Sequence, residues 1–415
     1  MEMEQSDRPK HDYSTLPEDI LTNISKRLHS IDDTLRFRAV CDMFRSLVST
    51  PLTNLIPKSA RRSSFRLGPL NNRRTQQQIR RIQKPASHFL LTESTVYAVE
   101  PRHPIYNPLE TTQTWMIRIE HTNSGEVRLK DPLCGYRFQS LYNKLPKCFN
   151  LLDHQIKEIT KAYQLEPARK SKGRSRLFYK GSFKKRPTFF VKVVASTATA
   201  PDDQFSVMAI HRSSKLFAWK IGDKSLTDIF LGHDSYEDII YHNRKFYALD
   251  YMGKTLSVDS RSFEVIRVTY MDSIIPAGRH HFVKSCEGLF LIFRCWAYED
   301  SRMCFEAFKL DEERNQWVPA VHELEDRALF VGEDCSFAVS AKEFRGCKGN
   351  FIYFKSNSFS KGVNEDYPGA SAGIFNFKDN SVGRLAVFPG YSEIFWPVPS
   401  WLNFHAASTS THAPH

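Results

Sequence analysis

The chain carries STLPEDILTNISKRLHSIDDTLRFRAVCDMFRSLVST at residues 14–50, the stretch that most restricts its fold. Pro17 suits the first position of a helix, because no hydrogen bond is lost there, and the two acids after it favour a helix N-terminus. Apolar residues then recur at helical spacing, at Ile20, Leu21, Ile24 and Leu28. Two further short helices are expected, at about residues 32–40 and 42–49, and Pro51 ends the last one.

Three helices of this length bury little apolar surface among themselves, so an apolar face is expected to remain for a partner. The stretch also matches a known motif at many positions. In chain order these are Leu16-Pro17, Ile20-Leu21, Ile24, Leu28, Asp33, Arg36, Arg38, Val40-Cys41, Arg45 and Leu47. They resemble the F-box, a trihelical motif with which its family docks on the Skp adaptor of cullin-based SCF ubiquitin ligases.

The resemblance implies a set of adaptor-binding residues. They are Leu16, Pro17, Ile20, Leu21, Ile24, Leu28, Val40, Cys41 and Phe44. The family usually has Trp where this chain has Phe44. Phenylalanine keeps the apolar volume but lacks the indole N–H, so docking is expected to be weaker without being lost. The alternative is a helical cap on the next domain that has drifted into resemblance.

The length and composition predict a two-domain protein. At 415 residues the chain exceeds one typical core. No apolar run approaches the roughly 20 residues that span a bilayer, so no membrane contact is expected. The acidic, polar N-terminus is unlike a secretory signal. Eight scattered cysteines then indicate reduced thiols in the cytosol or nucleus and no disulfide framework.

The net charge of +12 is concentrated in two segments. Residues 43–92 hold ten Lys and Arg and no acid, and residues 167–201 hold another ten and no acid. The rest of the chain is therefore net −8. This distribution indicates a mildly acidic body with two basic segments, and it does not favour a nucleic-acid binder.

Composition and pattern divide the chain into five parts. They are a disordered N-terminus (1–13), the F-box (14–50), a basic linker (51–85), a β domain (86–404) and a C-terminal tail (405–415). Dibasic clusters in the linker suit nuclear import or an anionic partner, and a solvated connector explains them equally well.

From about residue 86 the sequence consists of short aromatic and β-branched runs between turn residues. Roughly twenty strands over about 300 residues are too many for one open sheet, and the helices of a βαβ fold are missing. A β-propeller of about six blades fits best. Asn243 is expected in a tight hairpin turn. Residues 151–163 have apolar residues near helical spacing, although a strand there remains an alternative.

A basic loop near residues 167–187 interrupts this pattern. Its two clusters, about eight residues apart, comprise Arg169, Lys170, Lys172, Arg174 and Arg176, then Lys184, Lys185 and Arg186. They have the form of a bipartite nuclear signal, which an import receptor would bind by charge and hydrogen bonds. The alternative is an exposed inter-blade loop. Nucleic-acid binding is less favoured, because the interleaved aromatics suit a strand core.

The second half carries a further resemblance. Residues 238–253, 328–341 and 348–354, with the closing residues 373–377 and 394–402, resemble the C-terminal domain of a large plant F-box family. That domain was long catalogued only as of unknown function and is described as a β-propeller. With the F-box, the resemblance covers nearly the whole chain. These motifs belong to the scaffold and imply no ligand.

No pattern of an enzyme is found in the sequence. There is no Gly-x-Ser-x-Gly, no phosphate-binding loop, no His-Glu-x-x-His and no Cys-x-x-Cys. Cys286, Cys295 and Cys304 recur every nine residues, which suits strands better than zinc. His280-His281 suits a strand edge. We therefore expect no metal, no cofactor and no catalytic residue, and an enzyme with its site in a propeller channel is the least favoured class.

The combined expectation is a substrate receptor of an SCF-type ubiquitin ligase. The F-box would bind the Skp adaptor, and through it a cullin, while the propeller would hold a protein substrate of unknown identity near the ubiquitin-conjugating enzyme. The alternative is a nuclear propeller regulator with a degenerate F-box, working outside any ligase. The expected location is the nucleus, the cytoplasm or both.

Overall fold

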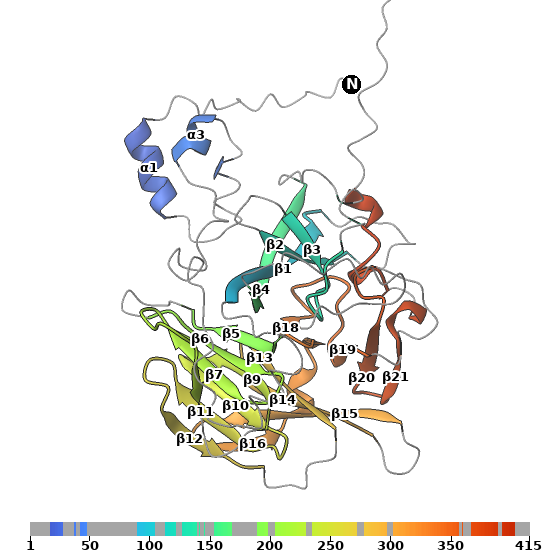
Figure 1. The fold of residues 1–415 in the computed structure, drawn as a ribbon. Helices are drawn as coiled ribbons and strands as arrows, with labels where there is room; N and C mark the ends of the chain where they lie inside the picture. The colour runs from blue at the N-terminus through green and yellow to red at the C-terminus, as the bar shows by residue number, and fades with distance from the viewer. Residues whose placement is uncertain are drawn as a thin grey trace, which may run out of the picture.

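The computed structural model describes two short helical pieces and a large β domain (Figure 1). The described residues are 17–27, 37–38, 42–47, 89–103, 113–121, 127–138, 141, 145, 153–167, 189–197, 204–229, 235–271, 278–296, 302–356, 359, 367–388 and 392–402. The helices are α1 (Glu18–Lys26) and α3 (Asp42–Leu47). The expected N-terminal tail, basic linker and C-terminal tail lie outside this part of the chain, as does the expected basic loop near 167–187 except for Pro167 at the end of β4.

The β domain is built from strands β1 to β21 with a few single turns of 3₁₀ helix. The strands are β1 (Phe89–Pro101), β2 (Trp115–His121), β3 (Val127–Lys130), β4 (His154–Pro167), β5 (Phe190–Ala195), β6 (Ser206–His211), β7 (Leu216–Lys220), β8 (Thr227–Ile229), β9 (Tyr236–His242), β10 (Lys245–Asp250), β11 (Thr255–Asp259), β12 (Val265–Thr269), β13 (Arg279–Ser285), β14 (Gly288–Trp296), β15 (Met303–Asp311), β16 (Gln316–Pro319), β17 (Arg327–Val331), β18 (Ser336–Ser340), β19 (Phe351–Lys355), β20 (Ala372–Asn376) and β21 (Ser381–Arg384). The 3₁₀ turns are η4 (Val321–Leu324), η6 (Leu385–Val387), η7 (Ser392–Ile394) and η8 (Ser400–Leu402). A mainly-β domain after the helices is therefore confirmed.

The strands form groups that follow one another around a ring. Sheet order gives β4-β1-β2-β3, β5-β6-β7-β8, β9-β10-β11-β12, β13-β14-β15-β16 and β18-β17-β19-β20-β21. The first strand of each group contacts the first strand of the next, and β18 contacts β4. This is the radial arrangement of a propeller, which protects most sheet edges. The described strands make five groups, so the expected number of about six blades stays a prediction.

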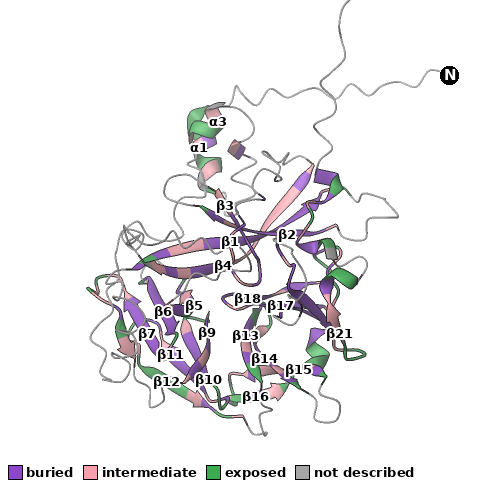
Figure 2. Ribbon diagram, turned by 45° about the vertical axis from the view of Figure 1, so that its right-hand side comes forward, coloured by how far each residue is buried: buried purple, intermediate pink, exposed green. Residues whose placement is uncertain are grey.

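Buried residues occur along the strands of every group (Figure 2). Apolar cores lie between successive groups and close the ring. Shared cores join Leu91 with Val207, Ile210 with Phe246, Leu249 with Leu291, Ile292 with Leu329, and Val96 with Phe330. Because side chains alternate along a strand, Leu291 and Ile292 of β14 face opposite neighbours. Each such side chain contributes about 1.5–3 kcal/mol on burial.

The β9–β10 hairpin confirms the predicted turn. His242 pairs with Lys245, so the turn has two residues, Asn243 and Arg244. Their φ angles are 45° and 62°. Two left-handed residues in a two-residue turn match the right-handed twist of the flanking strands, and asparagine tolerates that conformation.

The expected helix at residues 151–163 is wrong, and the alternative of a strand is right. This region is β4, which pairs with β1 along its whole length and carries a bulge opposite Val96 and Tyr97. The bulge adds Ile159 to β4 without a partner on β1. Apolar residues on the two sides of the bulge, such as Ile156 and Tyr163, are therefore separated by an odd number of positions instead of the even number of a regular strand. That spacing imitates a helix. Ile156, Ile159 and Tyr163 in fact belong to three different cores.

The first and last groups are joined by long-range hydrogen bonds. Trp115 donates through Nε1 to the carbonyl of Phe395 at 3.0 Å. The amide of Glu333 donates to the carbonyl of Leu133 at 2.7 Å. A Cβ at Gly332 would lie 2.4 Å from the same Leu133 oxygen. Only glycine allows this approach, which explains the glycine in the β17–β18 turn.

Candidate functional site

The N-terminal helices surround a core of three side chains. This core consists of Leu21 from α1, Phe44 from α3 and Phe37 from the segment between the two helices. The centres of the two phenyl rings lie 4.6 Å apart. Helix α1 begins at Glu18, one residue after the predicted first position, so Pro17 is its N-cap residue. The amide of Leu21 donates to the Pro17 carbonyl at 3.1 Å. A core this small stabilises the motif only weakly on its own.

Ile20 and Ile24 form an exposed apolar pair on α1. They lie one turn apart and are 44 % and 39 % exposed. The described residues thus leave a large part of both side chains accessible to solvent. Isoleucine is among the residue types most often buried, so two exposed isoleucines on one short helix are unusual. The pair is an exposed apolar face, and its predicted role in binding a partner stays a prediction.

The predicted adaptor-binding residues fall into three sets. Pro17, Ile20 and Ile24 are exposed, and Leu21 and Phe44 are buried in the core of the helices. Leu16, Leu28, Val40 and Cys41 lie outside the described residues, as does most of the second predicted helix. In this arrangement Leu21 and Phe44 support the exposed face. The position where the family usually has Trp is filled by a packed phenyl ring.

The predicted nuclear-signal residues cannot be placed. Arg169, Lys170, Lys172, Arg174, Arg176, Lys184, Lys185 and Arg186 all lie outside the described residues. The nuclear signal thus stays a prediction.

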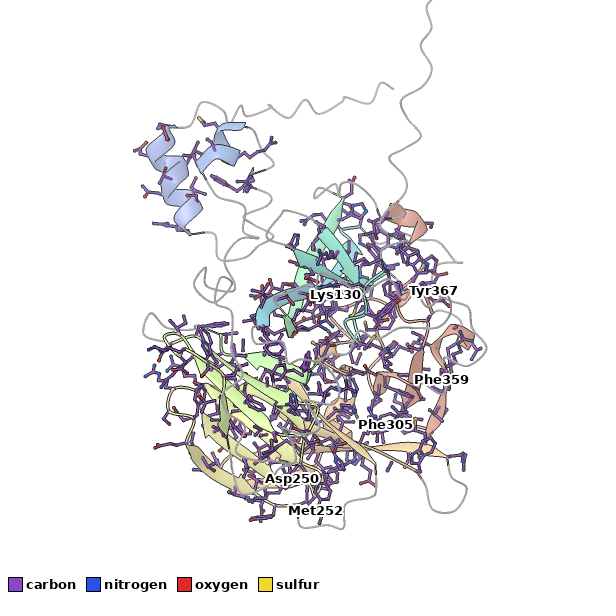
Figure 3. All side chains as sticks on the ribbon, in the orientation of Figure 1. Lys130, Asp250, Met252, Phe305, Phe359 and Tyr367 are labelled. Atoms are coloured by element: carbon purple, nitrogen blue, oxygen red, sulfur yellow. The ribbon has the colours of Figure 1, made fainter. Side chains whose placement is uncertain are left out.

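A buried ionic network, which the sequence does not predict, closes the ring. Arg118 of β2 donates two hydrogen bonds to Asp334 of the β17–β18 turn, at 2.9 and 2.8 Å. Gln164 donates to the same carboxylate at 3.0 Å and accepts from Lys130 at 2.9 Å. Figure 3 marks the place of Lys130 among the side chains. Lys130 also pairs with Glu120 at 2.9 Å. Every charged member has an opposite charge or a hydrogen-bond partner.

The network changes the pKa values of its members. Burial alone would raise the pKa of Asp334, but the Arg118 guanidinium outweighs it and holds that pKa below its usual range. Burial lowers the pKa of Lys130 to about 8, with Arg118 adding to the effect and Glu120 opposing it. Such a satisfied network serves the ring closure and leaves no group directed at a ligand.

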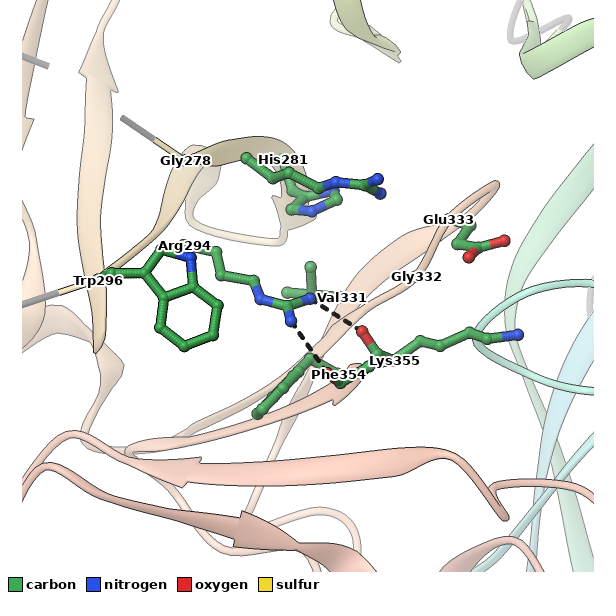
Figure 4. Close-up of a pocket in the computed structure, with 11 residues that line it drawn as sticks. Gly278, His281, Arg294, Trp296, Val331, Gly332, Glu333, Phe354 and Lys355 are labelled. Atoms are coloured by element: carbon green, nitrogen blue, oxygen red, sulfur yellow. Dashed lines mark hydrogen bonds between the residues drawn. The ribbon is translucent and has the colours of Figure 1, made fainter. Parts of the chain in front are cut away.

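A cavity of about 210 Å³ opens between β13–β14 and the ends of β17 and β19 (Figure 4). Its lining is formed by Gly278, Arg279, His281, Arg294, Trp296, Val331, Gly332, Glu333, Phe354, Lys355 and Ser356. Arg294 donates to the Lys355 carbonyl at 3.0 Å and to the Ser356 hydroxyl at 3.1 Å. Trp296 beside it is 52 % exposed. Volumes typical of small-molecule sites are about 300–1,000 Å³, so this cavity suits a single side-chain-sized group.

Neither a metal centre nor a membrane-spanning helix is found in the part of the chain that the structure describes. No group of three or more His, Cys, Asp or Glu is placed there to hold a metal ion. No helix among these residues is long and apolar enough to cross a membrane. His280 and His281 lie on β13, and Nδ1 of His280 contacts Glu237 Oε2 at 2.5 Å.

Known proteins are similar to the chain over almost its full length. A family model described as the KIB1-4 beta-propeller matches residues 89–376, and the F-box domain model matches residues 14–55. Neither model is an enzymatic domain. Three Arabidopsis thaliana relatives are F-box protein SKIP23 (26 % identical, covering 95 % of this chain and 96 % of the relative), F-box protein At2g17036 (24 %, 94 % and 95 %) and putative F-box protein At5g60060 (27 %, 94 % and 99 %). The chain belongs to the plant family of F-box proteins that carry a C-terminal KIB1-4 beta-propeller.

Proposed function

We propose that this F-box protein is the substrate-recognition subunit of an SCF-type ubiquitin ligase. The F-box binds a Skp-type adaptor, which links it to a cullin, and the propeller holds a protein substrate for ubiquitination. The observation that carries the proposal is the exposed Ile20–Ile24 pair, supported from beneath by Leu21, Phe37 and Phe44. Apolar anchors on a preformed face are the usual source of binding energy at an interface.

The mechanism requires no catalytic group in this chain. Binding to the propeller holds the substrate beside a ubiquitin-conjugating enzyme that carries ubiquitin. The transfer then takes place within one complex, so the effective concentration of the substrate at the enzyme is raised. We place the protein in the nucleus, the cytoplasm or both. A propeller of about six blades would present the substrate-binding loops.

Co-expression of the full chain with a Skp adaptor and a cullin tests the proposal. We expect both partners to co-purify with the parent protein and to be lost from an Ile20→Asp/Ile24→Asp variant. The matched control is Val265→Asp/Ile266→Asp on β12, where the two side chains are 40 % and 45 % exposed. Retention of the partners by the Ile20/Ile24 variant, or their loss from the control alone, contradicts the proposal.

The second candidate is a regulatory propeller protein that works in the nucleus outside any ligase. Phe44 favours it, since the family usually has Trp at that position. Under this alternative the parent protein enters the nucleus but binds no adaptor. A parent that co-purifies with adaptor and cullin rules it out.

A further inference from the structure

Two arginines oppose each other at the cavity between β13 and β14. Arg279 and Arg294 are direct register partners on these antiparallel strands, so their side chains leave the same face. Like charges directly opposite each other destabilise a strand pair. His281 follows two residues after Arg279 on this face, and Trp296 follows two residues after Arg294. We call these four residues, with the cavity that they line, the Arg279–Arg294 pocket.

Arg294 is held in place by neutral groups. Its guanidinium donates to the Lys355 carbonyl and the Ser356 hydroxyl, and it lies 5.1 Å from the centre of the Phe354 ring. Among the residues that the structure describes, no carboxylate lies within ion-pairing distance of Arg279 or Arg294. Guanidinium groups bind carboxylate and phosphate through charge-assisted hydrogen bonds. A guanidinium that is held in place but has no acidic partner is therefore suited to bind an anion.

The acid in the lining does not neutralise this pair. The side chain of Lys355 extends away from Arg294, on the side of the lining that also carries Glu333 (Figure 4). Burial alone would lower the pKa of Lys355, but Cys134, Asp131 and Glu333 raise it above its ordinary value. Among the described residues no ion pair joins Glu333 to Arg279 or Arg294, so the positive charge on the β13–β14 side stays unbalanced.

Burial and the excess positive charge together lower the pKa values of two residues in the pocket, Arg294 and His281. Burial lowers the pKa of Arg294, and the charge of Arg279 lowers it further. Burial, followed by the charges of Lys192, Arg279 and Arg294, lowers the pKa of His281 well below its ordinary value. His281 is therefore neutral at pH 7 and available as a hydrogen-bond donor without adding to the repulsion.

We propose that the Arg279–Arg294 pocket binds an oxyanion group, a carboxylate or a phosphoryl, carried by a protein partner. The two guanidinium groups supply charge-assisted hydrogen bonds, and the cavity accommodates one such side chain. The exposed indole of Trp296 supplies an apolar surface for the residue next to it. The inference rests on the proposed function, because it names the chemistry of the substrate that the propeller holds.

Peptide binding to the full chain tests this proposal. The probes are three labelled heptapeptides that differ only at the central residue, which is phosphoserine, glutamate or serine, and inorganic phosphate is the competitor. We expect the phosphoserine or the glutamate peptide to bind at least tenfold more tightly than the serine peptide, and phosphate to compete. The phosphoserine and glutamate arms distinguish the two oxyanions.

Matched variants separate a specific site from general attraction. Arg279→Gln should weaken binding of the charged peptide at least tenfold. Arg314→Gln, at a side chain that is 77 % exposed on the β15–β16 turn, should leave binding unchanged. Equal binding of all three peptides, no binding of any, or equal loss in both variants overturns the proposal. Adaptor co-purification is read separately, so failure of the ligase role and failure of the pocket are distinguishable.

A second, independent observation concerns Cys295 and Cys304. These cysteines are direct partners on β14 and β15, and their sulfur atoms lie 2.6 Å apart. A disulfide bond is about 2.05 Å long, so the two thiols are nearly in bonding position without movement of the strands. Cys295 is buried and Cys304 is half-buried, so an oxidant reaches Cys304 first.

We infer that Cys295 and Cys304 form a reversible disulfide when the protein meets a peroxide. The Cys304 thiolate attacks one oxygen of hydrogen peroxide, the O–O bond breaks, and a sulfenic acid and hydroxide form. The Cys295 sulfur then displaces the hydroxyl group from the Cys304 sulfur, and its proton leaves with that group as water. The hydroxide of the first step takes up the proton that Cys304 lost on ionising. In total two thiols are oxidised, and one peroxide is reduced to two waters.

Peptide mapping of the full chain tests this step. After peroxide treatment, blocking of free thiols and trypsin digestion, we expect residues 295–302 linked to residues 303–309, with a mass two hydrogens below the sum. Dithiothreitol should separate them, and Cys304→Ser should abolish the link. The exposed Cys286 is the internal control. Recovery of Cys295 and Cys304 as unlinked blocked thiols, under peroxide that oxidises Cys286, contradicts the inference.

Discussion

Two arginines in different strand groups of the propeller, Arg118 on β2 and Arg294 on β14, have opposite surroundings. Arg118 is fully buried and bound by two hydrogen bonds to the carboxylate of Asp334. Arg294 is half-buried and bound to a carbonyl and a hydroxyl, with Arg279 directly opposite. Both guanidinium groups are held in one position, but only Arg118 has its counter-charge in the chain.

The difference distinguishes a structural arginine from a binding arginine. A buried ion pair with all partners present joins the first and last strand groups, and its loss should affect folding. A fixed cation that lacks an anion contributes little to folding, and its loss should affect binding. The same residue type on the same kind of strand thus performs two tasks, and the local charge balance tells them apart.

Removing the counter-charge of Arg118 should have the largest effect. Asp334→Asn keeps the shape but leaves a buried guanidinium unpaired, so we expect the free energy of unfolding to fall by about 3–5 kcal/mol. Chemical denaturation of the full chain measures it. The control is Glu323→Gln, which breaks the exposed pair with Lys309 and should cost less than about 1 kcal/mol. A loss for Asp334→Asn as small as that of the control would show that the network does not close the ring.

Acid should affect the two regions in different pH windows. His281 has a lowered pKa in the folded protein, so the unfolded chain binds its proton first as the pH falls below about 6.5, and stability declines from there. Asp334 also has a lowered pKa, but its contribution is fully present above about pH 3.9 and is lost only below it.

A variant of His281 tests its part in the upper pH window. In a denaturation series from pH 7 to pH 3, His281→Asn should reduce the loss between pH 6.5 and pH 4. It should leave the loss at lower pH unchanged. A parent protein whose stability is constant from pH 7 to pH 4 would contradict this prediction.

Removing the charge of Arg279, which lies opposite Arg294, should have the smallest effect on stability. This change should stabilise the protein, whereas the loss of Asp334 should destabilise it. Arg279→Gln relieves a like-charge pair across β13 and β14, so we expect the free energy of unfolding to rise by about 0.2–1 kcal/mol. The gain should shrink at high salt, since screening weakens the repulsion. A destabilisation above about 1 kcal/mol would show that Arg279 has a structural partner and would remove the contrast with Arg118.

Local features of this fold could be predicted from the sequence. The strand-forming runs, the Asn243 turn and a helix start within one residue of Pro17 depend on a few adjacent residues, and the structure confirms all three. The exposed Ile20 and Ile24 also follow from local reasoning, because helices this short cannot cover both sides of α1.

Long-range features could not be predicted in this way. Arg118 and Asp334 are 216 residues apart in the chain, and nothing near either residue identifies the other. The opposition of Arg279 and Arg294 depends on the register of β13 and β14, which the sequence pattern does not give. In β4, the single extra residue Ile159 turned the period of a strand into that of a helix. Each of these features arises from tertiary pairing.

The most direct test of the adaptor-binding role is the affinity of the purified full chain for a purified Skp adaptor, measured by calorimetry. We expect a one-to-one complex, with affinity at least a hundredfold lower for Ile20→Asp/Ile24→Asp and unchanged for Val265→Asp/Ile266→Asp and Arg279→Gln. A folded parent protein that does not bind the adaptor, or an Ile20/Ile24 variant that binds as tightly as the parent, would contradict it.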